Sequence, residues 1–269
     1  MLSTEEFSST KSPHPMRTLA LLLLATLTLF PGTRASAQNE AEELRERVVN
    51  SVGGMDALHQ LKDVEYTYTS KRGTSTERYI FDGEISYGMS TTKEGKRRRQ
   101  YFDGENVRVW IDDVETTDEN ELKSALFTRK TNYYWLAMMQ KMSDPGLQFA
   151  YAGTREFEGI DYDLLDVTFN DNVGVAKDRY LLYVNPHTGL VDQFLFTVMA
   201  YERATPIMMK YTYDTFANGV KLPVVSQSHG ALNWEGDLDP KAKWGARWRT
   251  NFSFNNGFEK NTIYLPRIK

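Results

Sequence analysis

The stretch VVNSVGGMDALHQLKDVEYTY, from Val48 to Tyr68, contains the change of pattern that decides the fold. Its first part continues a helical stripe of apolar residues, two glycines end that helix, and a second short helical piece follows. From Val64 onward apolar and polar residues alternate strictly, which is typical of a strand with one buried face. A broken helix directly before a strand predicts helical pieces that cover a sheet.

Alternating segments separated by short turns occupy most of the remaining chain. The pairs Asp82-Gly83, Asp103-Gly104 and Asn218-Gly219 are strong hairpin signals, and the 15 Tyr, 14 Phe and 5 Trp favour sheet. Consecutive strands with short turns indicate an antiparallel meander. We therefore predict an α+β fold that is mainly antiparallel β, with a single large curved meander, or half-barrel, and helices covering its concave side. The later strands are expected at 147–157, 162–170, 177–184, 191–202, 206–216, 221–229 and 247–254.

The N-terminal region has the features of a secretory signal. Residues 18–30 form an uncharged apolar run of about 13 residues, shorter than the about 20 residues that a membrane span needs. Small residues at 35–37 suit a signal peptidase that cuts between Ala37 and Gln38. We expect a signal peptide at 1–37, with Met16 as an alternative start, and export to the periplasm. An uncleaved membrane anchor is the alternative.

The composition restricts the class of protein further. The chain has no cysteine, which excludes a lipid-modified cysteine, a disulfide framework and thiol chemistry. The net charge of −4 argues against nucleic acid as a partner. The mature part, about 230 residues, is long enough to bury its own core. We expect residues 38–269 to form one domain.

No catalytic set can be identified in the sequence. The four histidines lack metal-ligand spacing. The aspartate pairs around Tyr162 and Leu238 stand at a strand edge or in a loop, where aspartate is common. No G-x-S-x-G nucleophile elbow is present. We therefore predict no catalytic residue, no cofactor and no metal, and a hydrolase is the least favoured alternative.

A set of inward-facing apolar residues is the candidate ligand site. In a curved sheet that helices cover only partly, such residues line a hollow, and a ligand gains about 25 cal/mol for each Å² of apolar surface that it buries there. Methionine suits variable apolar partners because its side chain is flexible. The candidate lining is Trp135, Met138, Met139, Met142, Leu165, Val167, Phe169, Phe194, Phe196 and Val198. The alternative for all of these residues is an ordinary packed core.

Two further segments have a functional interpretation and a structural one. The long loop at 233–246, with Trp234, Trp244 and the neighbouring Trp248, is a candidate lid; alternatively, the tryptophans anchor the loop to the core. The basic run at 96–99 is a candidate for transient contact with anionic lipid head groups at a membrane surface. The alternative is a charged strand that resists aggregation.

Three motifs resemble a known family. They are Gly53-Gly54-x-x-Ala57-Leu58-x-x-Leu61, the strand at 162–167 with the hairpin at 178–190, and the hairpin at 213–223. Together they are similar to exported members of the LolA/LolB-like lipoprotein-carrier superfamily. The resemblance implies an unclosed β-barrel around a helical plug, with an apolar hollow for acyl chains. In the lipoprotein carrier a buried strand arginine helps to latch the lid; no position here matches it, and Arg179 and Arg203 are expected to face solvent.

These observations lead to two hypotheses from different classes. The first is an exported soluble carrier or sensor that binds a lipid, a lipoprotein acyl chain or another apolar molecule in the half-barrel. The second is a non-catalytic scaffold that binds other proteins of the cell envelope through an aromatic surface. A large interior pocket favours the first hypothesis, and a fully packed interior favours the second.

Overall fold

The structure is a computed structural model that describes residues 31–170 and 178–265. The predicted signal run and Lys177 of the expected strand at 177–184 lie outside these residues. The described helices are α1 (Pro31–Ser51), α2 (Gly54–Gln60) and α3 (Glu119–Ala137), with the short 3-10 helices η1 (Asp82–Glu84), η2 (Gln140–Ser143), η3 (Met199–Tyr201) and η4 (Ala217–Gly219). The described strands are β1 (Asp63–Ser70), β2 (Gly73–Ile80), β3 (Ile85–Thr91), β4 (Arg97–Phe102), β5 (Val107–Ile111), β6 (Val114–Glu115), β7 (Leu147–Phe157), β8 (Ile160–Phe169), β9 (Tyr180–Val184), β10 (Val191–Val198), β11 (Arg203–Thr215), β12 (Lys221–Gly230) and β13 (Gly245–Phe254).

The described strands form one antiparallel sheet in the order β6-β5-β4-β3-β2-β1-β13-β12-β11-β10-β9-β8-β7. Spatial neighbours are also sequence neighbours except at β1 and β13, whose pairing joins a first half (β1–β6) to a second half (β7–β13). Helix α3 carries the chain from β6 at one edge to β7 at the other. Since β6 and β7 do not pair with each other, the sheet stays unclosed. The predicted half-barrel meander is confirmed.

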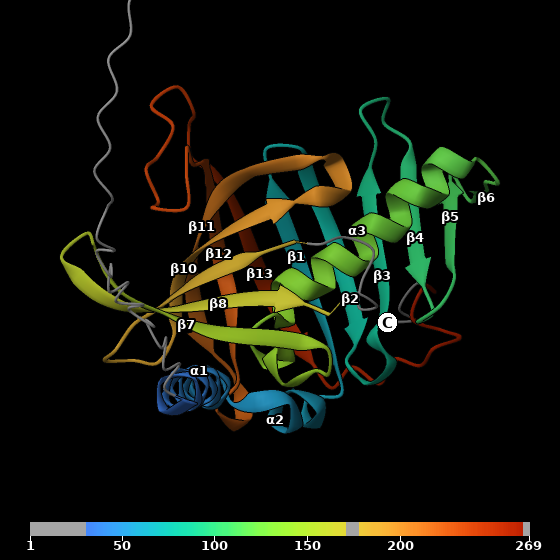
Figure 1. The fold of residues 1–269 in the computed structure, drawn as a ribbon. Helices are drawn as coiled ribbons and strands as arrows, with labels where there is room; N and C mark the ends of the chain where they lie inside the picture. The colour runs from blue at the N-terminus through green and yellow to red at the C-terminus, as the bar shows by residue number, and fades with distance from the viewer. Residues whose placement is uncertain (1–30, 171–177, 266–269) are drawn as a thin grey trace, which may run out of the picture.

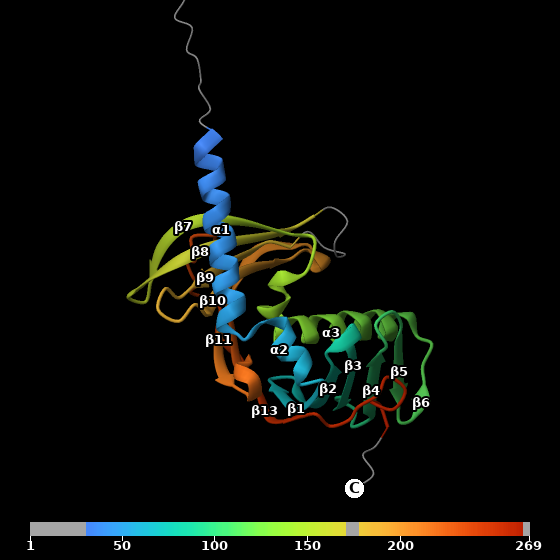
Figure 2. The ribbon, with the colours of Figure 1, turned by 90° about the horizontal axis from the view of Figure 1, so that it is seen from below.

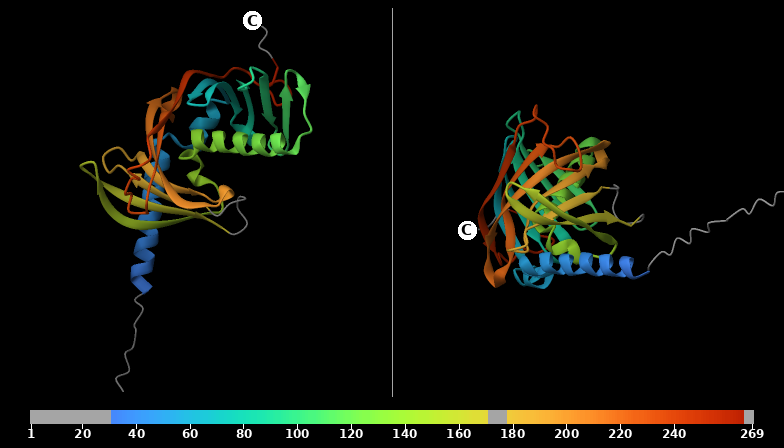
Figure 3. Two further views of the ribbon diagram at one scale, coloured as in Figure 1. Left: turned by 90° about the horizontal axis from the view of Figure 1, so that it is seen from above. Right: turned by 60° about the vertical axis from the view of Figure 1, so that its left-hand side comes forward.

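The helices lie inside the bend of the sheet and at one end of it. Helix α3 lies on the concave side against β3, β4 and β5 (Figure 2). Helix α1 packs on β7 and β8, and α2 follows it at the same end of the sheet (Figure 1). Figure 3 shows the sheet bending between its two halves, with α3 inside the bend. The concave side of the second half is therefore covered by α1 and by the segment that follows α3.

The two glycines of the opening stretch break the helix as predicted. Gly53 and Gly54 have φ values of +88° and +72°, which glycine adopts without strain. A Cβ atom on Gly53 would lie 3.1 Å from the carbonyl oxygen of Gly219. The break therefore turns the chain from α1 into α2 and also lets the backbone of η4 approach closely.

Both faces of the sheet carry apolar clusters. On the concave side one cluster lies between the second half and α1, and another joins β1 and β2 to α2 and α3. On the convex side one cluster includes Trp234 and Leu238 of the loop after β12, and another includes Ile263 of the C-terminal segment. Strand β9 is buried at every position because both of its faces are covered.

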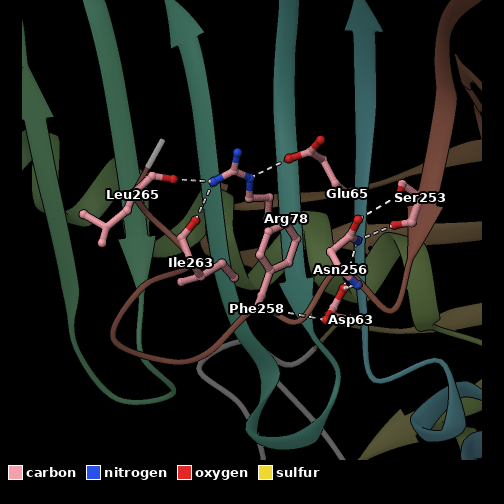
Figure 4. Close-up of polar contacts among 8 residues, drawn as sticks. All are labelled: Asp63, Glu65, Arg78, Ser253, Asn256, Phe258, Ile263 and Leu265. Carbon is pink, nitrogen blue, oxygen red and sulfur yellow. Dashed lines mark hydrogen bonds and ion pairs between the residues drawn. The ribbon is translucent and has the colours of Figure 1, made fainter. Parts of the chain in front are cut away.

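The C-terminal segment, residues 255–265, is held on the convex face of the first half (Figure 4). The carboxylate of Asp63 accepts hydrogen bonds from the backbone N–H groups of residues 256–258. Arg78 donates to the carbonyl oxygens of Ile263 and Leu265 at 2.8 and 2.9 Å. Charged side chains thus satisfy backbone groups at both ends of this segment.

Candidate functional site

The ten residues predicted to line a cavity lie together on the concave side of the second half, in one apolar cluster that we call the trough cluster. The buried members of the predicted set are Met138, Met139, Met142, Leu165, Val167, Phe194 and Phe196. The partly buried members are Trp135, Phe169 and Val198. Residues far apart in the sequence therefore meet where the resemblance places a ligand hollow.

The pairing of β8, β9 and β10 sets out these side chains in rows. Leu165 of β8 and Phe194 of β10 both pair with Leu182 of β9, so the three side chains stand side by side. Residues two positions apart in a strand point to the same face, which places a second row beside the first. That row consists of Val167, Tyr180 and Phe196.

Sequence analysis missed several members of the trough cluster. Tyr180 and Leu182 come from β9, and Met209 and Tyr211 come from β11. Helix α1 adds Ala41, Leu44, Val48 and Val52. The alternation that identified β8 and β10 also runs through β11 and would have found Met209 and Tyr211, whereas β9 is apolar at every position, so its sequence does not show which residues face the trough.

Trp135, near the end of α3, packs against the aromatic rows. Its ring centre lies 4.9 Å from that of Phe196 and 5.8 Å from that of Phe194. The hydroxyl of Tyr211 donates a hydrogen bond of 3.0 Å to the backbone carbonyl of Trp135. The end of α3 is therefore fixed above the strands by ring contacts and by one hydrogen bond.

Three methionines continue the cover where α3 ends. Met138 and Met139 follow the helix directly, and Met142 lies in η2. All three side chains are buried in the trough cluster, so side chains fill the space between the strands and the segment after α3. An unbranched thioether side chain can change shape at little cost, and this part of the cover is therefore adaptable.

A groove of about 540 Å³ opens beside the trough cluster, where α1 meets the beginning of β7. Met142, Leu147 and Phe149 line this groove and also belong to the trough cluster or pack against it. The polar wall of the groove includes Glu42 and Arg45, which form an ion pair. The groove thus reaches the trough cluster at Met142.

The loop predicted as a lid does not cover the trough. Trp234 packs on the convex face, where the Arg179 guanidinium lies 4.2 Å from its ring centre. Trp244 is 39% exposed beside His229, and Trp248 is 45% exposed on β13. The lid interpretation is wrong for this structure because strand alternation shows which residues share a face, whereas tertiary packing decides which face the loop covers.

The concave side of the first half contains a buried ion pair. Arg129 of α3 and Glu77 of β2 are 2% and 1% exposed, and their closest atoms, Nη1 and Oε2, lie 2.7 Å apart. Arg129 Nε donates to the Gln100 side chain, and the hydroxyls of Ser75 and Tyr79 donate to the Glu77 carboxylate. Burial is the largest single effect and lowers the pKa of Arg129, but the charge and hydrogen bonds of Glu77, together with the neighbouring Tyr79 and Tyr66, outweigh burial, and the pKa is raised.

This pair fixes the position of α3 on the sheet. A Cβ atom on Gly88 of β3 would lie 2.4 Å from the guanidinium of Arg129, so the pair needs glycine beneath it. Arg129 continues the helical stripe of Leu122 and Ala125, and an arginine in an apolar stripe was the signal that could have identified it. Arg179 and Arg203 are partly or largely exposed, as predicted.

The remaining candidates have structural partners or lie outside the trough. Arg97 and Arg99 pair with Asp113, and Arg98 pairs with Glu121, which favours the charged-strand interpretation of the basic run. Ala37 and Gln38 lie within α1. In residues 31–170 and 178–265, no group of three His, Cys, Asp or Glu residues could hold a metal ion. No helix in that part of the chain combines the length and apolar character needed to cross a membrane.

Several solved structures are similar to this chain. A DUF1329 family protein from Desulfovibrio piger is 12% identical, with 81% of this chain and 95% of that chain covered and a TM-score of 0.49. A LolA superfamily protein from Nitrosomonas europaea is 10% identical, with 82% and 97% covered and a TM-score of 0.46. The lipoprotein LppX from Mycobacterium tuberculosis is 13% identical, with 81% and 98% covered and a TM-score of 0.31. All three TM-scores lie below 0.5, so the likeness carries no conclusion about a superfamily or a ligand of this chain.

The chain belongs to DUF6503, a family of unknown function, whose model matches residues 62–216. The matched region runs from β1 through β11 and therefore includes α3 and the strands of the trough cluster. No curated protein matches the chain.

Proposed function

We propose that this protein is an exported carrier or sensor that binds a lipid, an acyl chain or another apolar molecule in the trough of the half-barrel. The trough is packed with side chains and is not an open interior pocket, and the groove beside it lies at the surface. The proposal therefore rests on the make-up of the trough cluster and on its capacity to open around a guest. Rows of aromatic and aliphatic side chains on the concave face are covered by Trp135 and three methionines. Side chains of this kind can rearrange around an apolar guest, and the gain is about 25 cal/mol for each Å² of buried apolar surface.

The groove at α1 supplies a way in. Met142 lies both in the wall of the groove and in the trough cluster, so a rotation of its side chain would connect the two. The partly buried Trp135, Phe169 and Val198 mark where the trough cluster reaches the surface. Export is inferred from the signal-like sequence of residues 18–37.

An uncharged fluorescent probe, N-phenyl-1-naphthylamine, tests this proposal. We expect the purified protein to bind the probe at one site and a long-chain alcohol to displace it. Val198→Trp puts extra volume into the partly buried end of the trough and should weaken probe binding at least about fivefold. Leu232→Trp, at a position 58% exposed, is the matched control and should leave binding unchanged.

The alternative role predicts a different outcome. Trp244 and Trp248 are exposed on the convex face, as a surface for another envelope protein would require. If the wild-type protein binds no apolar probe, or if Val198→Trp and Leu232→Trp bind the probe equally well, the carrier proposal is wrong. Loss of a co-purified envelope protein in a Trp248→Ala variant would then support the scaffold.

A further inference from the structure

Two arginines of β13 face the concave side between the two apolar clusters. Arg249 pairs with Tyr68 of β1, and Arg247 pairs with Ser226 of β12. Paired residues point to the same face of a sheet, and Tyr68 packs on the concave cluster beneath α2 and α3. Arg247 and Arg249 are two positions apart, so their side chains lie on that face together.

Neither guanidinium has a carboxylate partner in the described part of the chain. Arg249 is 4% exposed, donates a hydrogen bond of 3.1 Å to the carbonyl oxygen of Pro223, and has a buried Nε atom without a hydrogen-bond partner. Arg247 donates to the hydroxyl of Ser228 at 3.0 Å. Arg129, which is equally buried, has the full charge of Glu77 against it. A buried cation normally has a counter-charge, and none of the described residues supplies one to Arg249.

The arginine pair borders the trough cluster. From β10 to β13 the concave face changes step by step, from aromatic side chains to serines and then to arginines. Tyr211, a member of the trough cluster, pairs with Ser226, which in turn pairs with Arg247. Burial raises the pKa of Tyr211, and the charges of Arg249 and Arg247 oppose that rise, as expected if the three side chains are close.

We propose that Arg247 and Arg249 receive the anionic head group of an amphiphile whose acyl chain occupies the trough. The proposal rests on the proposed function and names its ligand class, a long-chain carboxylate or phosphate ester. Guanidinium groups form two parallel hydrogen bonds with either head group. Such a head group would accept a hydrogen bond from Arg249 Nε and neutralise a charge for which the described residues supply no carboxylate.

Ligands with the same chain and different head groups test the assignment. Displacement of N-phenyl-1-naphthylamine is measured with palmitate, palmitoyl lysophosphatidate and hexadecanol. For the wild-type protein we expect one or both anions to displace the probe at concentrations at least about tenfold below that of hexadecanol, because a hydrogen bond to a charged group contributes about that much to binding. The stronger of the two anions identifies the head group as carboxylate or phosphate.

Variants locate the effect. Arg249→Met and the less buried Arg247→Met should each reduce the anion preference to about threefold or less, while probe affinity stays unchanged. Arg108→Met, which removes an exposed arginine that pairs with Glu115, is the control and should keep the full preference. If the wild-type protein binds the probe but does not prefer the anions, or if the preference survives in both Arg249→Met and Arg247→Met, the head-group site is refuted and the carrier proposal stands. If no apolar molecule binds at all, the proposed function fails first.

Discussion

Removal of the Arg129 guanidinium should loosen α3 from the sheet and lower the stability of the whole domain. In Arg129→Met the side chain keeps most of its length but loses its charge and its hydrogen bonds to Glu77 and Gln100. Glu77, which is 1% exposed, then carries its charge without a counter-ion. The substitution therefore tests whether the pair holds the helix or only accompanies its packing.

The expected cost follows from the surroundings of Glu77. Breaking a buried ion pair by removing one partner costs about 3–5 kcal/mol. The hydroxyls of Ser75 and Tyr79 still donate to the carboxylate, which places the expected loss near the lower value, about 3 kcal/mol. Glu77→Gln should cost about 2–3 kcal/mol, because Arg129 keeps its charge in the same buried position. The double variant removes both charges and should cost no more than either single variant.

Urea unfolding followed by far-UV circular dichroism measures these free energies of unfolding. Arg108→Met is the control, since its pair with Glu115 is exposed and should contribute at most about 1 kcal/mol. Trp135 fluorescence gives a second readout, because a loosened α3 would expose the indole to water. Costs below about 1 kcal/mol for both single variants, or strictly additive costs in the double variant, would refute the reasoning.

Three further predictions concern other parts of the molecule. Gly53→Ala places a Cβ atom on a residue with a φ of +88°, 3.1 Å from the Gly219 carbonyl oxygen. It should destabilise the protein by about 1–3 kcal/mol in urea unfolding. The control is Gly159→Ala, which has a φ of +84° but no neighbouring atom within 4 Å and should cost less. Asp63→Ala removes the carboxylate that holds the C-terminal segment. Trypsin should then cleave at Lys260 at least about tenfold faster than in the wild-type protein, because cleavage follows the free energy of local opening. An unchanged rate would show that apolar contacts alone hold the segment. Burial raises the pKa values of Tyr66, Tyr79 and Tyr211 above the ordinary value of about 10. The folded state therefore holds these protons more tightly than the unfolded state, and the free energy of unfolding falls as the pH rises above about 10. Absorbance at 295 nm should report the ionisation of these tyrosines together with the loss of circular dichroism, not before it.

The fold could be predicted because its signals are local. Strand alternation and Asp-Gly or Asn-Gly turns placed the strand Leu147–Phe157 at its observed bounds and the later strands within a few residues. The candidate lining, taken from the apolar residues at 135–142 and from the strands at 162–170 and 191–202, lies in one cluster in the structure. Periodicity identifies the face on which a side chain stands, and these faces turned inward together.

Other features depended on contacts between distant segments. Glu77 and Arg129 are separated by 52 positions, and no local sequence pattern shows that these two residues form an ion pair. The loop with Trp234 and the C-terminal segment both cover the convex face, because apolar side chains of β2–β5 and β8–β11 line that face. The arginines of β13 could be placed on the concave face only after the pairing of β1 with β13 was known, because that pair joins the two ends of the meander.

The two faces of the sheet differ in what holds their covers in place, and this difference bears on where a ligand can exchange. On the convex side, Asp63 and Arg155 form charge-assisted hydrogen bonds with the backbone of the covering segments. To lift those segments, the protein must break these bonds and expose buried charge. Over the trough, the Gln140 side chain donates to the backbone carbonyls of Val52 and Lys221, and the three methionines fill the remaining space with apolar side chains. A change of methionine rotamer displaces these side chains without breaking those hydrogen bonds. We therefore expect an apolar guest to enter by displacing the methionine side chains, beside the arginines that we propose receive its head group.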